Sequence, residues 1–195
     1  MERRDEILDH AEHLFRQDGF KGVTLARIAQ SAGIRKPSMY HHFPGGKEEL
    51  FVEVQIRMYR RVGYELARIL SHREGVRIAE QLHECADWFL TQPPIFLLSM
   101  MHTDMSGLSA EAQETVAKTS YGLLMQPLVE AVREAIHRGH ARQGIDPHTV
   151  AGAFLALLEA NTITHERGFG APDLGTMVHH SVDLIILGLV PDTAQ

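Results

Sequence analysis

The sequence predicts an all-α protein, and three observations lead to this prediction. Apolar residues recur with the 3.6-residue period of helices along most of the 195 residues, and no segment shows the sustained alternation of a strand. Proline and glycine residues separate the periodic segments. Hydrophobic residues make up 44% and charged residues 23%, which is the balance of a globular rather than a disordered chain.

The N-terminal part predicts four helices. The first, at about 3–17, has one apolar face and stops at an Asp-Gly pair. The second begins after Thr24, a good N-cap residue. The third is short, at about 36–43, and tolerates a proline because it falls in the first turn. A Pro-Gly-Gly stretch at 44–46 then precedes a long fourth helix over about 47–70.

Five further helices are expected, at about 75–91, 94–105, 110–140, 147–165 and 173–189. No flexible linker divides the chain, so we place the domain boundary inside the long fourth helix, near Arg61. The predicted domains are therefore 1–61 and 62–195.

Residues 24–50 have the pattern of two short helices joined by a glycine turn. The small Ala29 lets the helices cross closely, and Gly33 ends the first of them with a positive φ at no steric cost. The positions where the helices must pack are apolar: Ile28, Ala32, Ile34 and Met39. The residues left to face outward are Arg35, Lys36, Ser38, Tyr40 and His41. These side chains supply donors for phosphates and base edges, so we expect this unit to read DNA.

The net charge of −6 is unevenly distributed, and this bears on DNA binding. Residues 1–62 contain eleven Lys and Arg against nine Asp and Glu, a net charge of +2, whereas the rest of the chain carries −8. Salt screens charges beyond about 8–10 Å, so the local field at the docking face matters most. We therefore expect contacts focused on one face rather than an all-round basic surface.

A series of short matches within 5–51 carries a family resemblance, in order and with near-family spacing: Ile7-Leu8, Leu14-Phe15, Gly19-Phe20, Thr24, Ile28-Ala29, Ala32-Gly33-Ile34, Tyr40, His42-Phe43 and Lys47-Glu48-Glu49-Leu50. With them the chain resembles the TetR family of bacterial one-component transcriptional regulators over about a quarter of its length. The resemblance implies an N-terminal three-helix helix-turn-helix DNA-binding domain, joined through a long helix to a helical ligand-binding and dimerisation domain. Two features depart from the family pattern: Arg35 replaces the usual Ser or Thr cap, and Gly45-Gly46 adds a residue to the following loop.

The resemblance also implies a DNA-contacting set, with 36–43 as the recognition helix in the major groove. Its members are expected to be Thr24, Arg35, Lys36, Ser38, Tyr40, His41 and Lys47. Arg35 either reads guanine or contacts only phosphate, and both readings stay open. Tyr40, Thr24 and Lys47 are expected at phosphates, with a merely solvated lysine as the alternative for Lys47.

The segment 85–105 is dense in methionine and aromatic residues, which favours an apolar cavity for a small molecule. The expected ligand residues are Trp88, Phe89, Phe96, Met100, Met101, His102, Met105, Tyr121, Met125, Leu158, Asn161 and His165. For any single residue, plain helical core is the alternative. A fatty acyl or aromatic effector is the first hypothesis. A sensor of hydrophobic cations or drugs is the second, with Glu84, Asp87, Asp104 and Glu159 as anionic partners.

The last two helices are too apolar for a surface position, which indicates a homodimer. The expected interface residues are Val150, Phe154, Leu157, Val178, Val182, Ile185, Ile186 and Leu189. A two-fold dimer would present its recognition helices about 34–36 Å apart, which requires a palindromic double-stranded DNA operator.

Several other classes of protein are disfavoured. The charged first helix predicts no secretory signal, no apolar run reaches the roughly 18–20 residues of a membrane span, and the single Cys85 suits a reducing cytoplasm. Thirteen histidines occur, but His137/His140 and His179-His180 form no recognisable ligand set, so no metal or cofactor is expected. The chain is therefore interpreted as a cytoplasmic, ligand-released repressor. Two alternatives remain: a helical enzyme with a histidine metal site, and a purely structural helical dimer with no DNA role.

Overall fold

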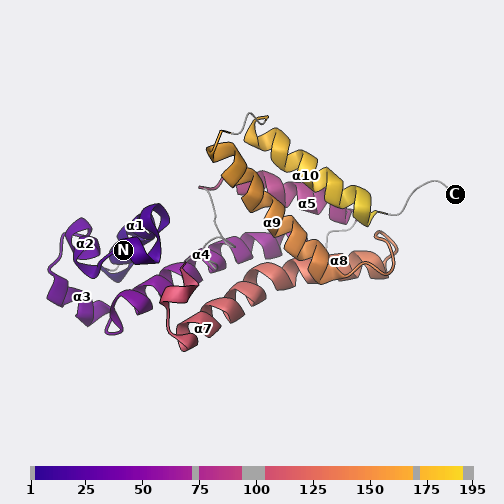
Figure 1. Ribbon diagram of the computed structural model, residues 1–195. Coiled ribbons are helices and arrows are strands. Elements are labelled where there is room, and N and C mark those ends of the chain that lie inside the picture. The colour runs from indigo at the N-terminus through magenta and orange to yellow at the C-terminus, as the bar shows by residue number, and fades with distance from the viewer. Residues whose placement is uncertain (1–2, 72–74, 94–103, 169–171, 191–195) are drawn as a thin grey trace. The chain divides into compact units, whose positions relative to one another are not determined.

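Figure 1 shows the computed structural model, which is built of helices. The structure describes residues 3–71, 75–93, 104–168 and 172–190, and these ranges contain no β-strand. The helices are α1 (Arg3–Gly22), α2 (Leu25–Ser31), α3 (Lys36–His42), α4 (Gly46–Leu70), α5 (Ile78–Leu90), α7 (Ala110–Ser120), α8 (Gln126–His137), α9 (Pro147–Glu166) and α10 (Leu174–Leu189), with a 3-10 turn η1 (Met105–Gly107) and a π-helical turn η2 (Tyr121–Met125). The prediction of an all-α fold is confirmed.

Most expected helices are found within a few residues of their expected bounds. The helix expected at 94–105 lies outside the described residues except for its end, where Met105 begins η1. No helix in the described ranges combines the length and apolarity needed to cross a membrane.

The chain divides into two compact units. The first comprises Met1–Arg61 and Ser99–Ser120, and the second comprises Val62–Leu98 and Tyr121–Gln195. The first unit thus includes a segment that the sequence-based division assigned to the second domain. The assignment of DNA binding to 1–61 and of ligand binding to 62–195 stays a prediction.

Three phenylalanines form the centre of the first unit. The rings of Phe15 and Phe20 each meet the ring of Phe51, with 5.0 Å between centroids in both pairs, and such edge-on aromatic contacts add to the energy of burial. Gly19 has a φ of +66°, so α1 bends there and returns Phe20 to the core. The first helix ends at this bend, as the sequence predicts, and a short further helical segment runs to Gly22.

The helix-turn-helix forms as the sequence predicts. Thr24 is the N-cap of α2 and its hydroxyl oxygen accepts a hydrogen bond from the Arg27 amide at 3.2 Å. Gly33 has the positive φ, +65°, that the turn requires. The residues under the turn are buried: Ile28, Ala29, Met39 and Phe43 are each 2% exposed or less. A helix of seven residues is not stable alone in water, so this burial is what holds α3 in place.

The Lys47 ammonium joins the end of α1 to the start of α2. It donates to the carbonyl oxygens of Phe20 at 2.9 Å and Val23 at 3.1 Å, and it lies 4.0 Å from the centroid of the Phe20 ring. A charged donor on a carbonyl contributes about 1.5–3 kcal/mol, and a cation over an aromatic face adds to this. Lys47 therefore stabilises the first unit.

The second unit packs α5, α8, α9 and α10 around a buried apolar core that includes Leu82, Cys85, Leu128, Val132 and Phe154. The expected single helix at 110–140 is instead three consecutive segments, α7, η2 and α8.

The π-helical turn has a physical cause. Pro127 has no amide hydrogen, so it cannot donate to the Leu123 carbonyl one turn earlier, and a helix deforms at such a point. Gly63 of α4 lies against this carbonyl, since a Cβ at that glycine would be 2.7 Å from the Leu123 oxygen. A glycine is therefore required where α4 meets the turn.

Two aspartates begin the last two helices. Asp146 accepts from the hydroxyl and amide of Thr149, and Asp173 accepts in the same way from Thr176. The threonine hydroxyl bond is the main cause that lowers the pKa of each carboxyl. A lowered pKa means that each cap stabilises the fold at neutral pH, and that this contribution is lost as the pH falls through the carboxyl's folded-state pKa.

We predict that Lys47→Met lowers the free energy of unfolding by about 2 kcal/mol, because two carbonyls lose a charged donor. Urea denaturation followed by circular dichroism measures this change. Lys21→Met is the matched control, because the Lys21 ammonium is exposed and has a single long contact, 3.3 Å to the Ser106 hydroxyl. Equal stabilities for the two variants would contradict the stabilising role of Lys47.

Candidate functional site

The outer face of α3 is polar while its inner face is buried. Tyr40 is 47% exposed, and Arg35, Lys36 and His41 are exposed too, with Ser38 half-buried. On the opposite side of the helix Met39 is fully buried. The expected contact residues in and before α3 are therefore accessible, apart from the half-buried Ser38. Thr24, also exposed, lies at the start of α2.

Most arginines of the first unit are engaged with acidic residues, which lowers the positive charge left for other contacts. The pairs are Arg3–Glu6, Arg4–Glu53, Arg27–Asp18, Arg57–Asp9 and Arg61–Glu12. In the described part of the chain, no hydrogen bond or ion pair is found for the Arg35 or Lys36 side chain. Arg35 and Lys36 therefore leave two positive charges at the start of α3 available to a ligand.

Arg4 fixes the other end of α3. Its guanidinium lies 4.6 Å from the centre of the Phe43 ring, and its Nε donates to the carbonyl of His42 at 3.4 Å. The hydrogen bond to Glu53 is the main cause that raises the pKa of Arg4, whose guanidinium stays charged at any working pH. The C-terminal end of α3 is therefore anchored to α1 and α4.

Two expectations about the DNA face are changed or refined by the structure. Lys47 uses two of its three donors inside the first unit, so it is not the freely projecting phosphate contact that the sequence predicted. Arg35 is the N-cap of α3 and makes no side-chain capping bond, as its replacement of Ser or Thr led us to expect. The Arg35 guanidinium is consequently left for other contacts.

The expected ligand residues do not form one described cluster. Phe96, Met100, Met101 and His102 lie outside the described residues. Met105 belongs to the first unit and packs on its core. The other seven are in the second unit: Trp88, Phe89, Tyr121, Met125, Leu158, Asn161 and His165.

Several of those seven already have partners within the unit. Leu158 is buried, and Trp88 and Phe89 contact each other edge-on at 5.2 Å. The Asn161 amide donates to the Ser181 hydroxyl at 2.8 Å, and the Tyr121 hydroxyl is 3.0 Å from His148 Nε2. Asn161 therefore links α9 to α10.

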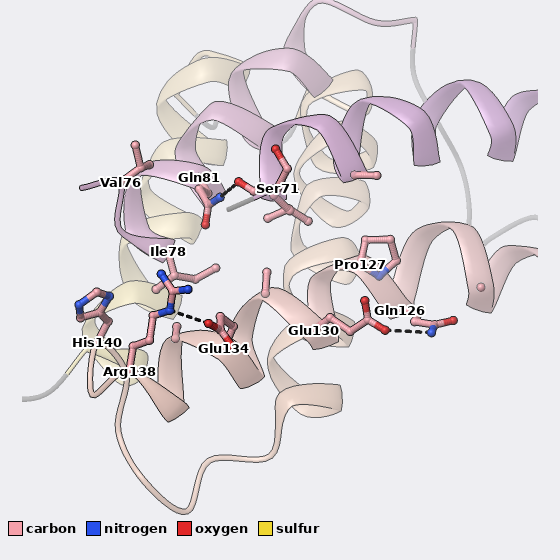
Figure 2. A pocket seen from close by; sticks show the side chains of 15 residues that line it. Ser71, Val76, Ile78, Gln81, Gln126, Pro127, Glu130, Glu134, Arg138 and His140 are labelled. Carbon is pink, nitrogen blue, oxygen red and sulfur yellow. Dashed lines mark hydrogen bonds and ion pairs between the residues drawn. The ribbon is translucent and has the colours of Figure 1, made fainter. Parts of the chain in front are cut away.

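A cavity of about 500 Å³ lies elsewhere in the second unit (Figure 2). Its walls come from the end of α4, the start of α5 and the length of α8, and they include Leu70, Val76, Ile78, Gln81, Pro127, Glu130, Glu134, Arg138 and His140. None of the expected ligand residues that the structure describes lines it. Gln81 was the available signal in the sequence, because it interrupts the apolar face of its helix beside Ile78, Leu82 and Cys85.

The expected dimer residues need correction. Five of them are buried in the protomer's own core, because α9 and α10 pack there against α5 and α8: Val150, Phe154, Val178, Val182 and Leu189. Leu157, Ile185 and Ile186 are partly exposed. The large apolar side chains that project from α10 are instead Leu184, 68% exposed, and Leu187, 71% exposed.

In the described ranges, no group of three or more His, Cys, Asp or Glu is arranged to hold a metal ion. Two histidines form cross-helix pairs between α5 and α10: His83 with Asp183 at 3.0 Å, and His179 with Asp87 at 2.7 Å. Asp87 and Glu84, two of the anionic partners suggested for a cation, are thus engaged, Glu84 with Arg68 at 3.8 Å. Asp104 accepts from the Phe20 amide in the first unit, and Glu159 is buried.

Comparison with known proteins agrees with this arrangement. A sequence profile described as bacterial regulatory proteins, tetR family, matches residues 7–54. The chain is 39% identical over 64 residues to the HTH-type transcriptional regulator LmrA of Bacillus subtilis, covering 33% of this chain and 34% of LmrA. It is 25% identical over 193 residues to the HTH-type transcriptional regulator BetI of Brucella anthropi, covering 96% and 94%. The match to LmrA, the stronger of these two identities, thus spans only about a third of the length of LmrA.

Solved structures share the fold over nearly the whole chain. Reduced NemR of E. coli superposes with a TM-score of 0.79 at 20% identity, covering 99% of this chain and 100% of NemR. FadR of Bacillus subtilis, solved with stearoyl-CoA, gives 0.76 at 17% identity, covering 94% and 97%. The helix-turn-helix of the chain thus matches the tetR family of bacterial regulatory proteins in sequence, and the chain shares the fold of these solved structures over nearly its full length.

Proposed function

We propose that the chain is a DNA-binding transcriptional regulator that inserts α3 into the major groove. The observation that carries this proposal is the surface of α3, where Arg35, Lys36 and Tyr40 are exposed above a buried Met39. A helix with free cationic and hydroxyl donors on one face, fixed to a rigid base by the other, is what groove reading requires. The named relatives LmrA and BetI are regulators, which favours this function over an enzyme.

The proposed DNA contacts are of two kinds, those to base edges and those to phosphates. Arg35 is able to bond guanine O6 and N7 together, a contact that contributes about 1–3 kcal/mol of discrimination against the wrong base. Lys36, Tyr40 and His41 are assigned to phosphates or neighbouring bases, and the Thr24 hydroxyl to a phosphate. Lys47 acts on DNA binding indirectly, through the stability of the unit that carries α3.

We also propose that two copies associate through α10. Leu184 and Leu187 lie one turn apart on its exposed side, and Leu157, Ile185 and Ile186 offer further partly exposed apolar area. Apolar side chains gathered on one helix face are typical of a protein interface. Two-fold symmetry would give a palindromic operator with half-sites about 34–36 Å apart.

We assign to the second unit the binding of an effector, and the bound effector would release the chain from its operator. FadR of Bacillus subtilis was solved with stearoyl-CoA, and a regulator of Saccharomonospora viridis with choline, so proteins of this fold bind effectors as different as an acyl thioester and an organic cation. An effector lowers DNA affinity only as far as it binds the released conformation more tightly. Repression in the cytoplasm is the simplest mode of action for such a protein.

We predict that Arg35→Ala and Tyr40→Phe each weaken DNA binding without changing stability. The DNA is a duplex selected by the full chain from a random library, and titration at several salt concentrations measures the affinity. Loss of an arginine–phosphate contact lowers the slope of log K against log salt by about one, and loss of the neutral Tyr40 hydroxyl lowers the affinity without changing that slope. Loss of a base contact lowers the affinity about 5- to 100-fold for the selected duplex alone.

The matched control for that titration is Arg77→Ala. Arg77 is an exposed arginine in the second unit and has no side-chain capping bond. Undiminished affinity and an unchanged slope in both α3 variants would rule out the proposed contacts. If Arg77→Ala weakened DNA binding as much as the two α3 variants do, the loss of affinity would not be specific to α3.

We predict that the full chain sediments as a dimer and that the double variant Leu184→Glu with Leu187→Glu sediments as a monomer, because four carboxylates would then be buried at a two-fold interface. Tyr64→Glu is the control, since Tyr64 of α4 is 70% exposed. Analytical ultracentrifugation gives the result. A wild-type monomer, or a double variant that remains dimeric, would refute the α10 interface.

A further inference from the structure

Two histidines of the chain share a local pattern that none of the others has. Of the thirteen histidines, only two are followed four residues later by a carboxylate: His83 by Asp87, and His179 by Asp183. The first pair lies in α5 and the second in α10. Residues four apart lie on the same side of a helix, one turn from each other. Two ligands at this spacing are a common way for a helix to hold a metal ion.

The fold brings these two pairs together. Helices α5 and α10 pack against each other (Figure 1), and each histidine reaches the aspartate of the other helix. His83 Nε2 lies 3.0 Å from Asp183 Oδ1, and His179 Nε2 lies 2.7 Å from Asp87 Oδ1. The two imidazole rings also meet edge-on, with 5.7 Å between their centroids. The four side chains therefore form one group on the surface of the helix pair, in which imidazoles and carboxylates alternate.

The distances within this group are close to those around a shared zinc ion. Zinc holds imidazole nitrogens and carboxylate oxygens at about 2.0–2.2 Å in a tetrahedron, so two of its ligand atoms lie about 3.4 Å apart. The two N···O separations, 3.0 and 2.7 Å, would have to widen by only a few tenths of an ångström. Two imidazole rings on one tetrahedral zinc ion have centroids about 5 Å apart, slightly less than the 5.7 Å found here.

The side chains need a small rearrangement to hold an ion. As they stand, each imidazole pairs with one carboxylate, and no three of these donors surround a common point within the described residues. An ionised carboxylate only accepts hydrogen bonds, so the histidine Nε2–H donates to it, and a metal ion would take the place of that hydrogen while the ring carries its hydrogen on Nδ1. All four side chains are between 34% and 62% exposed, and exposed side chains change rotamer readily.

We propose that His83, Asp87, His179 and Asp183 form a zinc site that links α5 to α10. Two imidazoles and two carboxylates fill the four positions of a tetrahedral zinc ion, and the two carboxylates neutralise its charge. Imidazole ligands favour zinc over Mg²⁺ and Ca²⁺, which prefer sites made only of oxygen atoms. The site lies wholly within the second unit and does not rest on the proposed DNA function.

Isothermal titration of the full chain with zinc sulfate, after treatment with a chelator, tests the site, and magnesium sulfate is the comparison. We expect one zinc ion per chain to bind about a hundredfold or more tightly than magnesium, because imidazole is a poor ligand for magnesium. We also expect zinc to raise the melting temperature, since the ion binds the folded chain. Absence of zinc binding, or equal affinity for magnesium, would overturn the proposal.

Variants locate the bound ion. His83→Ala and His179→Ala each remove one ligand, and Asp183→Asn removes a charge while keeping the shape of the side chain. Loss of even an outer partner of a metal ligand weakens binding about 10- to 100-fold, so we expect each variant to bind zinc at least tenfold more weakly. The matched control is His180→Ala, because His180 is exposed and adjacent to His179 in the same helix. Wild-type affinity in His83→Ala or His179→Ala, or an equal loss in His180→Ala, would overturn the site.

Cobalt in place of zinc tests whether one ion is shared between the two helices. Four-coordinate Co²⁺ absorbs visible light strongly, whereas six-coordinate Co²⁺ absorbs it weakly. We expect a strong visible band that saturates at one Co²⁺ per chain and is lost in both His83→Ala and His179→Ala. A weak band that saturates at two ions per chain, one for each histidine–aspartate pair of a single helix, would overturn the shared site.

Discussion

The burial of Met39 and Phe43 beneath α3 is the constraint on which the candidate interface depends. A seven-residue helix has too few internal hydrogen bonds to persist alone, so its position is set by these two side chains and by the Arg4 contact at its C-terminal end. The same packing fixes which residues face out. Lys47, on the Phe20 and Val23 carbonyls, holds together the end of α1 and the start of α2. The presentation of Arg35, Lys36 and Tyr40 is therefore a consequence of the core.

Local chemistry made the first unit predictable from sequence. The Thr24 cap, the positive φ of Gly33 and the alternation of buried and exposed residues along α3 each depend on neighbours a few positions away. The all-α class followed in the same way from periodicity. These features need no knowledge of distant contacts, and the structure confirms them.

The predictions that failed concern contacts between residues that are distant in the sequence. Apolar spacing indicated that Phe154 and Val182 are covered, and did not tell whether the protomer or a partner covers them. Lys47 looked like a surface lysine because its carbonyl partners lie more than twenty residues away. The cavity is lined by residues of different helices, among them Gln81 of α5 and Glu130 of α8. The only sign of it in the sequence was Gln81, a polar residue that interrupts the apolar face of its helix. In these cases the sequence predicted where the helices lie, and it did not predict which helices pack against each other.

The most direct test of the account is a photo-crosslink from α3 to DNA. An azidophenylalanine replaces Tyr40 in one variant and Tyr64, the still more exposed tyrosine of α4, in another. Each full-length variant is irradiated with the duplex that the wild-type chain selects. The account predicts a crosslink from position 40 and none from position 64. A crosslink from position 64 alone, or none from position 40 in a variant that still binds the duplex, would contradict it.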